Sequence, residues 1–391
     1  MSWNISEKPI MVNTIKKRGF SCVYKSSHPL SSCYMNETQI SKIFSKIIMD
    51  SSKDLPKDEI TRTKMYVFAT AGLRILPEYQ QNDIISRVYS YLYTNSPYKV
   101  KKKYIRIMSG DEEGLYGWIS VNYLMNSLSY DNITYGSIDM GGASTQVAYQ
   151  IENKQSSEHI INYNSKDFYV KSESLLGFGV NEAMKKTFAL LNNFHPCFPK
   201  GFSMNLSNGI IINGSGSFWK CTEIIQKIIP KKEFIILKNE FISMASFYYL
   251  NSFFNLTEGS SIEELSNHTI HFCELEWELM NRMFISNEYL KNYCFFGAYQ
   301  YLFLQGSFGY SFSKTSVKKV GHINGSELSW AIGAMMVIIG SVKIDKLHVP
   351  LLPMLVANFA LVIEITFIML PISNKRKSYS YHQSTLLKRI F

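Results

Sequence analysis

The stretch that decides the fold is Ile138-Asp139-Met140-Gly141-Gly142-Ala143-Ser144-Thr145-Gln146, in which an apolar run ends at two adjacent glycines. Adjacent glycines let backbone N–H groups converge on an anion, because no Cβ atom stands in the way of a phosphate. Ser144 and Thr145 add hydroxyl donors, and Asp139 is placed to hold a divalent cation through water, since hard cations prefer oxygen ligands. The stretch predicts a phosphate-binding hairpin, and a tight hairpin with polar turn residues is the alternative that it leaves open.

The segments around this hairpin alternate between strand and helix patterns. Short apolar runs predict strands over 65–70, 104–108, 135–140 and 146–150, and a helical pattern covers 77–94. The segment Ser109–Gly114 predicts a turn that leads into a helix through Trp118 and Tyr123. Strands interleaved with helices are typical of an α/β fold, which is the fold class expected here.

Two further positions carry polar groups that a catalytic cleft would use. Glu112 and Glu113 stand together in the turn Gly110–Gly114, where a carboxylate could act as a general base toward water. Acidic residues at a helix start are also ordinary partners of the helix dipole, so that alternative stays open. Thr70 ends a predicted strand beside small residues, where its hydroxyl could meet a phosphate oxygen or belong to an ordinary turn.

Length and charge limit the classes of protein that remain. A chain of 391 residues, at about 150 residues per domain, holds two folded lobes or one lobe with a large insertion. Its formal net charge of +10 suits an anionic partner such as nucleic acid, a phosphorylated substrate or an acidic membrane surface. The basic clusters are short and isolated, and no nucleic-acid-binding motif is present, so no nucleic-acid partner is expected.

One long apolar run, Val349–Ile372, predicts a transmembrane helix, because its 24 positions span the roughly 30 Å hydrocarbon core at about 1.5 Å per residue. A buried core helix is the alternative. Basic residues follow in 373–391, and the positive-inside rule places this tail in the cytoplasm and the preceding chain outside the cell or in a lumen. Six cysteines and eight Asn-x-Ser/Thr sequons fit an oxidising secretory compartment, so the expected location is the cell membrane.

The amino terminus does not fit this topology. Met1–Phe20 is polar and basic and has no apolar stretch that could act as a signal peptide. We therefore expect an incomplete or alternatively started chain.

Three segments in order resemble the apyrase motifs of the ecto-nucleoside triphosphate diphosphohydrolases. They are Ala69-Thr70-Ala71-Gly72-Leu73-Arg74, the segment Ser109–Tyr123 and the segment Ile138–Gln146. The likeness continues at Tyr293–Tyr299 and Ser329–Met336 and covers about residues 15–375. With its predicted carboxyl-terminal anchor, the chain resembles the membrane-bound, cell-surface branch of this family.

The resemblance implies two ribonuclease-H-like lobes, as in actin and sugar kinases, with a cleft between them and a C-terminal transmembrane helix. The expected boundaries are lobe I over 1–110, completed by about 322–346, lobe II over 111–321, the transmembrane helix over 349–372 and the tail over 373–391. The family's first motif, an Asp-x-Gly-Ser-Ser/Thr phosphate loop, has no counterpart before Thr70. Lobe I is therefore expected to be incomplete at its amino terminus.

The resemblance also implies roles for individual residues. Glu113 would be the general base that deprotonates the attacking water, with Gln146 and Ser144 helping to place that water. Asp139 would orient hydrated Ca²⁺ or Mg²⁺, and Tyr249 falls where the family stacks the base on an aromatic ring, with a core aromatic as the alternative. The phosphates would be held by Thr70, Gly141, Gly142, Ala143, Ser144 and Thr145. The implied disulfides are Cys197–Cys221 and Cys273–Cys294, and a local Cys22–Cys33 bridge would depart from the usual family spacing.

The function that follows is hydrolysis of extracellular nucleoside tri- and diphosphates, such as ATP and ADP, to the monophosphate and inorganic phosphate by cation-assisted in-line attack of water. The alternative is a catalytically impaired, membrane-anchored relative that binds nucleotide or a protein partner, because the first phosphate loop is missing. The expected partners are nucleotides and the membrane, and homo-oligomerisation is left open.

Overall fold

The computed structural model describes residues 29–346 except 54, 130–132, 153–158, 192, 207–208, 285–286 and 313–315, together with the backbone of two short strands, β1 (Ser2–Asn4) and β2 (Ile10–Val12). Its elements belong to one compact unit, Met1–Asp345, apart from the last residue of the final strand. Across these residues the structure contains no helix that is both long and apolar enough to cross a bilayer. The predicted span 349–372, the tail 373–391 and Cys22 lie outside the described residues.

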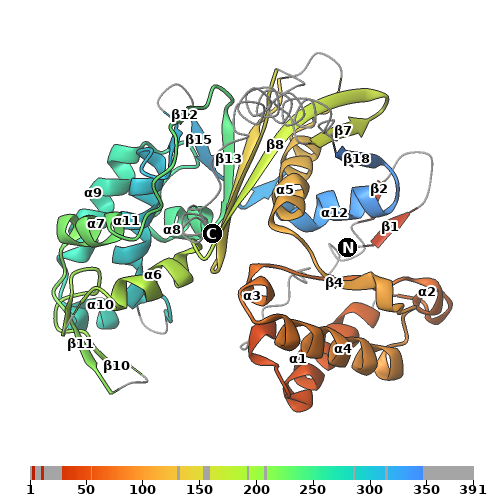
Figure 1. Ribbon diagram of the computed structural model, residues 1–391, viewed down its shortest axis with the longest axis horizontal. Coiled ribbons are helices and arrows are strands. Elements are labelled where there is room, and N and C mark those ends of the chain that lie inside the picture. Colours follow the sequence, from red (N-terminus) through yellow and green to blue (C-terminus); the bar gives the residue numbers. More distant parts are fainter. Residues whose placement is uncertain are drawn as a thin grey trace, which may run out of the picture. The chain divides into compact units, whose positions relative to one another are not determined.

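A seven-stranded mixed sheet positions the glycine hairpin (Figure 1). Its strand order is β15 (Val317–Lys319), β13 (Phe241–Ala245), β5 (Gly136–Met140), β6 (Ser144–Gln150), β8 (Lys166–Leu176), β7 (His159–Tyr163) and β18 (Val342–Lys346). β5, β13 and β15 are parallel to one another, whereas β5, β6, β8 and β7 pair in antiparallel fashion. The turn between β5 and β6 is the predicted hairpin, and it lies between the central strands of the sheet.

Helices pack on both faces of this sheet. On one face α5 (Gly110–Leu124) and α12 (Trp330–Ile338) pack together around a core that includes Trp118 and Phe168. The other face contributes Ile138 and Met140 to a larger core. The helices of that core are α6 (Val180–Phe188), α7 (Phe218–Gln226), α8 (Ser246–Phe253), α9 (Ile262–Cys273), α10 (Trp277–Met283) and α11 (Tyr293–Leu304). Each fully buried aromatic or aliphatic side chain in these cores stabilises the fold by about 1.5–3 kcal/mol.

Residues 29–109 build a smaller α/β layer with its own core. Two parallel strands, β3 (Val67–Ala69) and β4 (Ile105–Ile107), pack with the helices α1 (Glu37–Ser52), α2 (Lys57–Arg62), α3 (Ala71–Arg74) and α4 (Glu78–Asn95). Ile84, Val88 and Leu92 recur at the spacing of one helical face of α4 and are fully buried. In this layer Thr70 directly follows β3 and precedes α3, at the strand end where the sequence pattern predicted it.

Most of the secondary structure predicted from the sequence is confirmed. The four predicted strands appear as β3, β4, β5 and β6, and the two predicted helices appear as α4 and α5, with ends that differ by a few residues. The predicted turn over 109–114 is wrong, because the Ser109–Glu112 capping box starts α5 at Gly110. The α/β class is confirmed as well. The lobe boundaries stay a prediction, and the structure adds that α12, which was assigned to lobe I, contacts α5 closely enough for the Gly333 N–H to donate to Ser120 Oγ at 2.8 Å.

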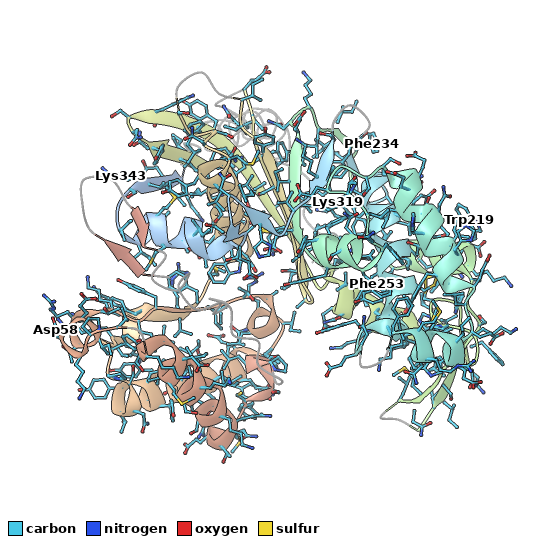
Figure 2. The ribbon with its side chains drawn as sticks, turned by 180° about the vertical axis from the view of Figure 1, so that it is seen from behind. Asp58, Trp219, Phe234, Phe253, Lys319 and Lys343 are labelled. Carbon is cyan, nitrogen blue, oxygen red and sulfur yellow. A yellow bond between two sulfur atoms is a disulfide. The ribbon has the colours of Figure 1, made fainter. Side chains whose placement is uncertain are left out.

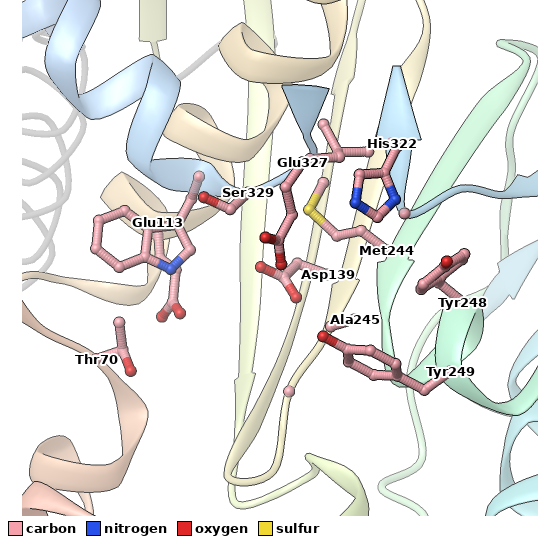
Figure 3. Close-up of a pocket in the computed structure, with 14 residues that line it drawn as sticks. Thr70, Glu113, Asp139, Met244, Ala245, Tyr248, Tyr249, His322, Glu327 and Ser329 are labelled. Carbon is pink, nitrogen blue, oxygen red and sulfur yellow. The ribbon is translucent and has the colours of Figure 1, made fainter. Parts of the chain in front are cut away.

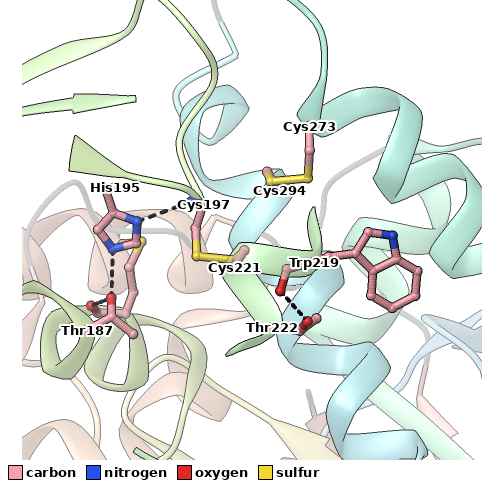
Figure 4. The surroundings of a disulfide bond; sticks show 9 residues. Thr187, His195, Cys197, Trp219, Cys221, Thr222, Cys273 and Cys294 are labelled. Atoms are coloured by element: carbon pink, nitrogen blue, oxygen red, sulfur yellow. Dashed lines mark hydrogen bonds between the residues drawn. A yellow bond between two sulfur atoms is a disulfide. The ribbon is translucent and has the colours of Figure 1, made fainter. Parts of the chain in front are cut away.

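Two disulfides join the helices and strands of the larger core (Figure 4). Cys197 is bonded to Cys221 of α7, and Cys273 at the end of α9 is bonded to Cys294 in α11. These are the two pairs that the resemblance implied. Cys33 is a buried thiol in the described structure, and its pairing with Cys22 stays a prediction because Cys22 lies outside the described residues.

The ammonium group of Lys319 is buried and has a hydrogen-bond acceptor. Figure 2 shows Lys319 among the packed elements, whereas Trp219 and Phe234 lie at the periphery. Lys319 is only 3% exposed, and its ammonium group donates to the carbonyl of Ser260. Burial lowers the pKa of Lys319 to about 8, because desolvation disfavours the charged form.

Candidate active site

A cavity of about 720 Å³, called the main pocket below, brings several predicted residues together (Figure 3). Its lining includes Thr70, Glu113, Asp139, Gly141 and Tyr249, which come from segments far apart in the sequence. The strands β16 (His322–Ile323) and β17 (Ser326–Glu327) form a hairpin beside it. That hairpin and the start of α12 complete the lining with His322, Glu327, Leu328, Ser329 and Trp330.

The first residues of α6 hydrogen-bond to the glycine turn. The first two N–H groups of α6 donate to the carbonyls of Gly141 and Gly142 at 3.0 and 2.9 Å. These bonds fix the peptide planes of the turn. Within the described residues, the N–H groups of Gly142 and Ala143 donate to no protein acceptor, so they remain for an anion.

The hydroxyls beyond the turn have other partners in the structure. The Thr145 hydroxyl is fully buried and donates to the carbonyl of Phe178 at 2.8 Å, which ties the hairpin to the chain that precedes α6. Ala143 and Thr145 do not line the main pocket. Ser144 is buried behind the turn and lies 2.6 Å from the side-chain amide of Gln146. Phosphate binding by Ala143, Ser144 and Thr145 stays a prediction.

The start of α5 places Glu113 at the pocket. Ser109 and Glu112 form a capping box, in which each side chain accepts a hydrogen bond from the backbone N–H of the other. The helix then lies against β8 so closely that a Cβ atom at Gly114 would stand 2.3 Å from Ser172 Oγ. A larger residue at Gly114 would force the Ser172 side chain to move. The neighbouring Glu113 lines the pocket.

Glu113 is the centre of a buried polar network. Arg74 Nη2 donates to Glu113 Oε2 at 2.8 Å, and Gln146 Nε2 reaches the same oxygen at 3.3 Å. Arg74 also donates to the carbonyl of Met108 at 3.0 Å and to Ser144 Oγ at 3.3 Å. Burial raises the pKa of the Glu113 carboxyl, although the Arg74 guanidinium acts in the opposite direction.

Asp139 stands at the end of β5 in the same pocket. Burial and the negative charge of Glu113 together raise the pKa of Asp139 to about 7. In Figure 3 the carboxylates of Asp139 and Glu327 point into the pocket. Both groups offer the oxygen atoms that Ca²⁺ and Mg²⁺ prefer, so the side chains present fit such an ion.

A second cavity, of about 440 Å³, adjoins the main pocket and is called the aromatic hollow below. The two cavities share Gly141, Ala245 and Tyr249 in their linings. The rest of the hollow is mostly aromatic or small, with Tyr289, Tyr293, Phe253, Phe296, Asn181, Gly142, Ser246 and Ser252 among its residues. Tyr249 is 47% exposed, so it is not a core aromatic, which was the alternative for it.

Sequence reasoning missed four residues of the site. Arg74 lies inside the first motif, yet only the fold reveals its ion pair with Glu113. Glu327 and His322 stand just before the last motif, and their relevance depends on a hairpin that the sequence pattern did not predict. Ala245 lines the pocket as well, and nothing in its residue type indicates the backbone conformation that it has there.

Comparison with known proteins identifies the family. The sequence pattern of the GDA1/CD39 (nucleoside phosphatase) family matches residues 5–350. Nucleoside-triphosphatase ntp-1 of Caenorhabditis elegans is 27% identical, covering 97% of this chain and 78% of the relative. Ectonucleoside triphosphate diphosphohydrolase 1 of Bos taurus is 28% identical over 78% of this chain and 71% of its own length. The solved nucleoside triphosphate hydrolase of Neospora caninum has the same fold, with a TM-score of 0.59 and 14% identity over 77% of this chain and 78% of that chain. The resemblance noted in the sequence is thereby confirmed, and the chain belongs to the GDA1/CD39 (nucleoside phosphatase) family.

Proposed function

We propose that the main pocket hydrolyses nucleoside tri- and diphosphates to the monophosphate and inorganic phosphate. The observation that carries this proposal is the meeting of two features in one pocket. Glu113, a buried glutamate with a raised pKa, lines the main pocket together with Gly141. Gly141 begins the glycine turn, in which the N–H groups of Gly142 and Ala143 donate to no protein acceptor among the described residues. One feature suits activation of water and the other suits binding of a phosphate.

Glu113 is the proposed general base. Within the described part of the chain, the hydrogen bonds that Glu113 accepts come from Arg74 and Gln146, and both end on Oε2. Oε1 is therefore left to accept the proton of an attacking water. Burial raises the pKa of Glu113 toward neutral pH. A general base is most effective when its pKa lies near the pH at which the enzyme works. Gln146 and Ser144 contact each other and the Glu113 network, so they are the proposed positioning residues for that water.

The phosphate chain is the proposed ligand of the glycine turn and Thr70. Phosphoryl transfer requires mainly positioning and neutralisation of charge on the phosphate oxygens. The turn supplies N–H groups that α6 holds in place, and the Thr70 side chain makes no capping hydrogen bond within α3. Thr70 and Gly141 line the pocket from different segments, so they would contact different oxygens of one phosphate chain.

A divalent cation, Ca²⁺ or Mg²⁺, belongs to the proposal. Among the described residues, no group of three or more His, Cys, Asp or Glu side chains is arranged to hold a metal by itself. Asp139 and Glu327 would hold the hydrated ion together with phosphate oxygens of the substrate. When bound, such an ion neutralises phosphate charge and favours the ionised form of Asp139.

The aromatic hollow is the proposed place of the base. Tyr249 lines both cavities, and a nucleobase over its ring would leave the phosphates free to reach the main pocket. Stacking on an aromatic face is worth about 1–3 kcal/mol per base. This arrangement retains the role that the family resemblance implied for Tyr249.

The finer topology also belongs to the proposal. We place the site between two ribonuclease-H-like lobes in an ecto-enzyme anchored by 349–372, with the site outside the cell or in a lumen. The disulfides support an oxidising compartment. The exposed asparagines of five sequons support glycosylation, and they are Asn36, Asn205, Asn255, Asn267 and Asn324.

Phosphate release from the full chain tests the proposed function. ATP and ADP should each yield phosphate in the presence of Ca²⁺, and AMP should yield none. Excess chelator should abolish release, and added Ca²⁺ or Mg²⁺ should restore it. Release that persists undiminished in chelator would contradict the cation requirement. A folded chain that binds nucleotide and releases no phosphate would instead support the impaired, nucleotide-binding relative.

A further inference from the structure

Ala245 holds a backbone conformation that L-amino acids rarely adopt. It ends β13 and immediately precedes α8, with φ at 57° and ψ at −119°. At such a φ the Cβ atom crowds the neighbouring backbone, so glycine is the usual residue. Other residues persist there only where the surrounding structure fixes them, and such positions cluster at functional sites.

Hydrogen bonds fix this sharp turn between strand and helix. Ser246 Oγ donates to the carbonyl of Met140 at 2.6 Å, and the side-chain amide of Gln300 donates to the carbonyl of Ser246 at 2.9 Å. Ala245 itself is paired with Met140 across β13 and β5. The position of Ala245 is therefore set by the strand that carries the glycine turn and by α11.

The turn lies where the two cavities meet. Ala245 lines both the main pocket and the aromatic hollow, as do Gly141 and Tyr249. In the view of Figure 3, Ala245 stands between Asp139 and the ring of Tyr249. A ligand that occupies both cavities at once would lie beside the three residues that line both, Gly141, Ala245 and Tyr249.

We infer that Ala245 is a specificity-determining residue for nucleoside phosphates, whose methyl group forms the passage that the ribose occupies between the two cavities. The inference rests on the proposed function for the identity of the ligand. A side chain larger than methyl would fill the passage and exclude the nucleoside half. The phosphate half would still bind, because Thr70 and the proposed cation-holding carboxylates of Asp139 and Glu327 line the main pocket.

Binding of two ligands separates these halves. The ligands are a non-hydrolysable nucleoside triphosphate analogue and inorganic tripolyphosphate, each with Ca²⁺, titrated calorimetrically into the full chain. Ala245→Asn adds bulk with a short polar side chain. Ala189→Asn, at an exposed position after α6, is the matched control for the same change. Ala245→Gly removes the methyl group without backbone strain.

The expected result is selective. Ala245→Asn should lower the affinity for the analogue by about tenfold or more, because the larger side chain overpacks the site. The affinity for tripolyphosphate should change by less than about twofold. Ala245→Gly should weaken only the analogue, by about fourfold, the value of one buried methyl-sized group. Ala189→Asn should change neither affinity.

Several outcomes would overturn the inference. Equal weakening of both ligands by Ala245→Asn, or no weakening in a folded variant, contradicts it, and thermal unfolding shows whether that variant folds. If Ala245→Asn does not fold, equal behaviour of both ligands with Ala245→Gly contradicts it in the same way. A wild-type chain that binds both ligands and hydrolyses no nucleotide would refute the proposed function while leaving the inference intact.

Discussion

Glu112 and Glu113 are adjacent in sequence and differ in almost every physical respect. The Glu112 side chain is 35% exposed, caps α5 and accepts two hydrogen bonds from Arg106 at 2.8 and 2.9 Å. The Glu113 side chain is 8% exposed and accepts one hydrogen bond from the Arg74 guanidinium. Burial would raise the pKa of Glu112, yet the bonds from Arg106 and Ser109 outweigh it and lower that pKa. For Glu113, burial prevails and the pKa is raised.

The difference teaches that position on the helix, more than residue type, decides the role. Successive residues of an α-helix point in directions about 100° apart, since there are 3.6 residues per turn. One glutamate therefore faces the helix start and the solvent, and the next faces the pocket. An exposed pair with two parallel bonds stabilises local structure, whereas a buried carboxylate with one free oxygen keeps a proton-accepting atom available.

The largest expected effect comes from removing one carboxylate and not the other. Glu113→Gln should lower kcat for ATP by about 10²–10⁴-fold and leave nucleotide affinity nearly intact, because the general base is lost and the shape is kept. Glu112→Gln is the matched control and should lower kcat by less than about threefold. Activity of Glu113→Gln within threefold of the wild type would move the role of base to another acid.

Replacing the arginine partner of each glutamate in turn, Arg74 for Glu113 and Arg106 for Glu112, sharpens the comparison. Arg74→Met should lower kcat/KM by about 10²-fold, because the base is no longer held in place. It should also move the acidic limb of the pH–rate profile to higher pH, since Arg74 now holds the pKa of Glu113 below the value that burial alone would set. Arg106→Met should leave that limb where it is, and Arg74→Lys should restore part of the shift. A rate loss without a shift in the profile would mean that Arg74 supports only the fold.

A buried group without a charged partner tests the effect of burial on its own. His195 is fully buried between Thr187 Oγ1, at 2.8 Å, and the Cys197 N–H, at 3.2 Å (Figure 4). Burial lowers its pKa from 6.5 to about 4, so the unfolded chain binds this proton at a higher pH than the folded chain. The free energy of unfolding should therefore fall as the pH drops from 6.5 to 4, by up to about 3 kcal/mol.

Denaturant unfolding at several pH values measures this effect. His195→Gln should flatten the dependence between pH 6.5 and 4, even if it lowers stability at neutral pH. His268→Gln, at an exposed position of α9, is the control and should keep the wild-type slope. The same slope in His195→Gln as in the wild type would assign the acid sensitivity to other groups.

The smallest expected effect concerns Ser109, the N-cap of α5 and the capping-box partner of Glu112. Ser109→Ala removes the hydroxyl that accepts from the Glu112 N–H at 3.1 Å, and should lower the free energy of unfolding by about 1 kcal/mol. Turnover should change little at temperatures where the chain is folded. A loss of kcat as large as that of Glu113→Gln would show that the helix start and the pocket are not separable.

Local patterns predicted the hairpin, α4 and most of α5, because a glycine turn after an apolar strand and an acidic helix start are visible within a few residues. The same pattern left Glu112 and Glu113 as alternatives, and only the family resemblance pointed to Glu113 as the base. The pairing of Arg74 with Glu113 was not predictable, since it joins positions 39 residues apart through the tertiary fold. The engaged hydroxyl of Thr145 was missed for a related reason, because its acceptor, the carbonyl of Phe178, follows a different strand. Ala245 shows a further limit, since strain is a property of backbone angles and leaves no trace in residue type.

The way α6 grips the glycine turn has a consequence for motion. The Val180 N–H donates to the carbonyl of Gly141, the Asn181 N–H to that of Gly142 and the Gly177 N–H to that of Ala143. The turn cannot lift without breaking the start of the helix, so it should act as a fixed cradle and not as a lid. In hydrogen–deuterium exchange these amide protons should open together, as one cooperative unit. Entry of substrate and release of phosphate would then depend on movement elsewhere around the pocket.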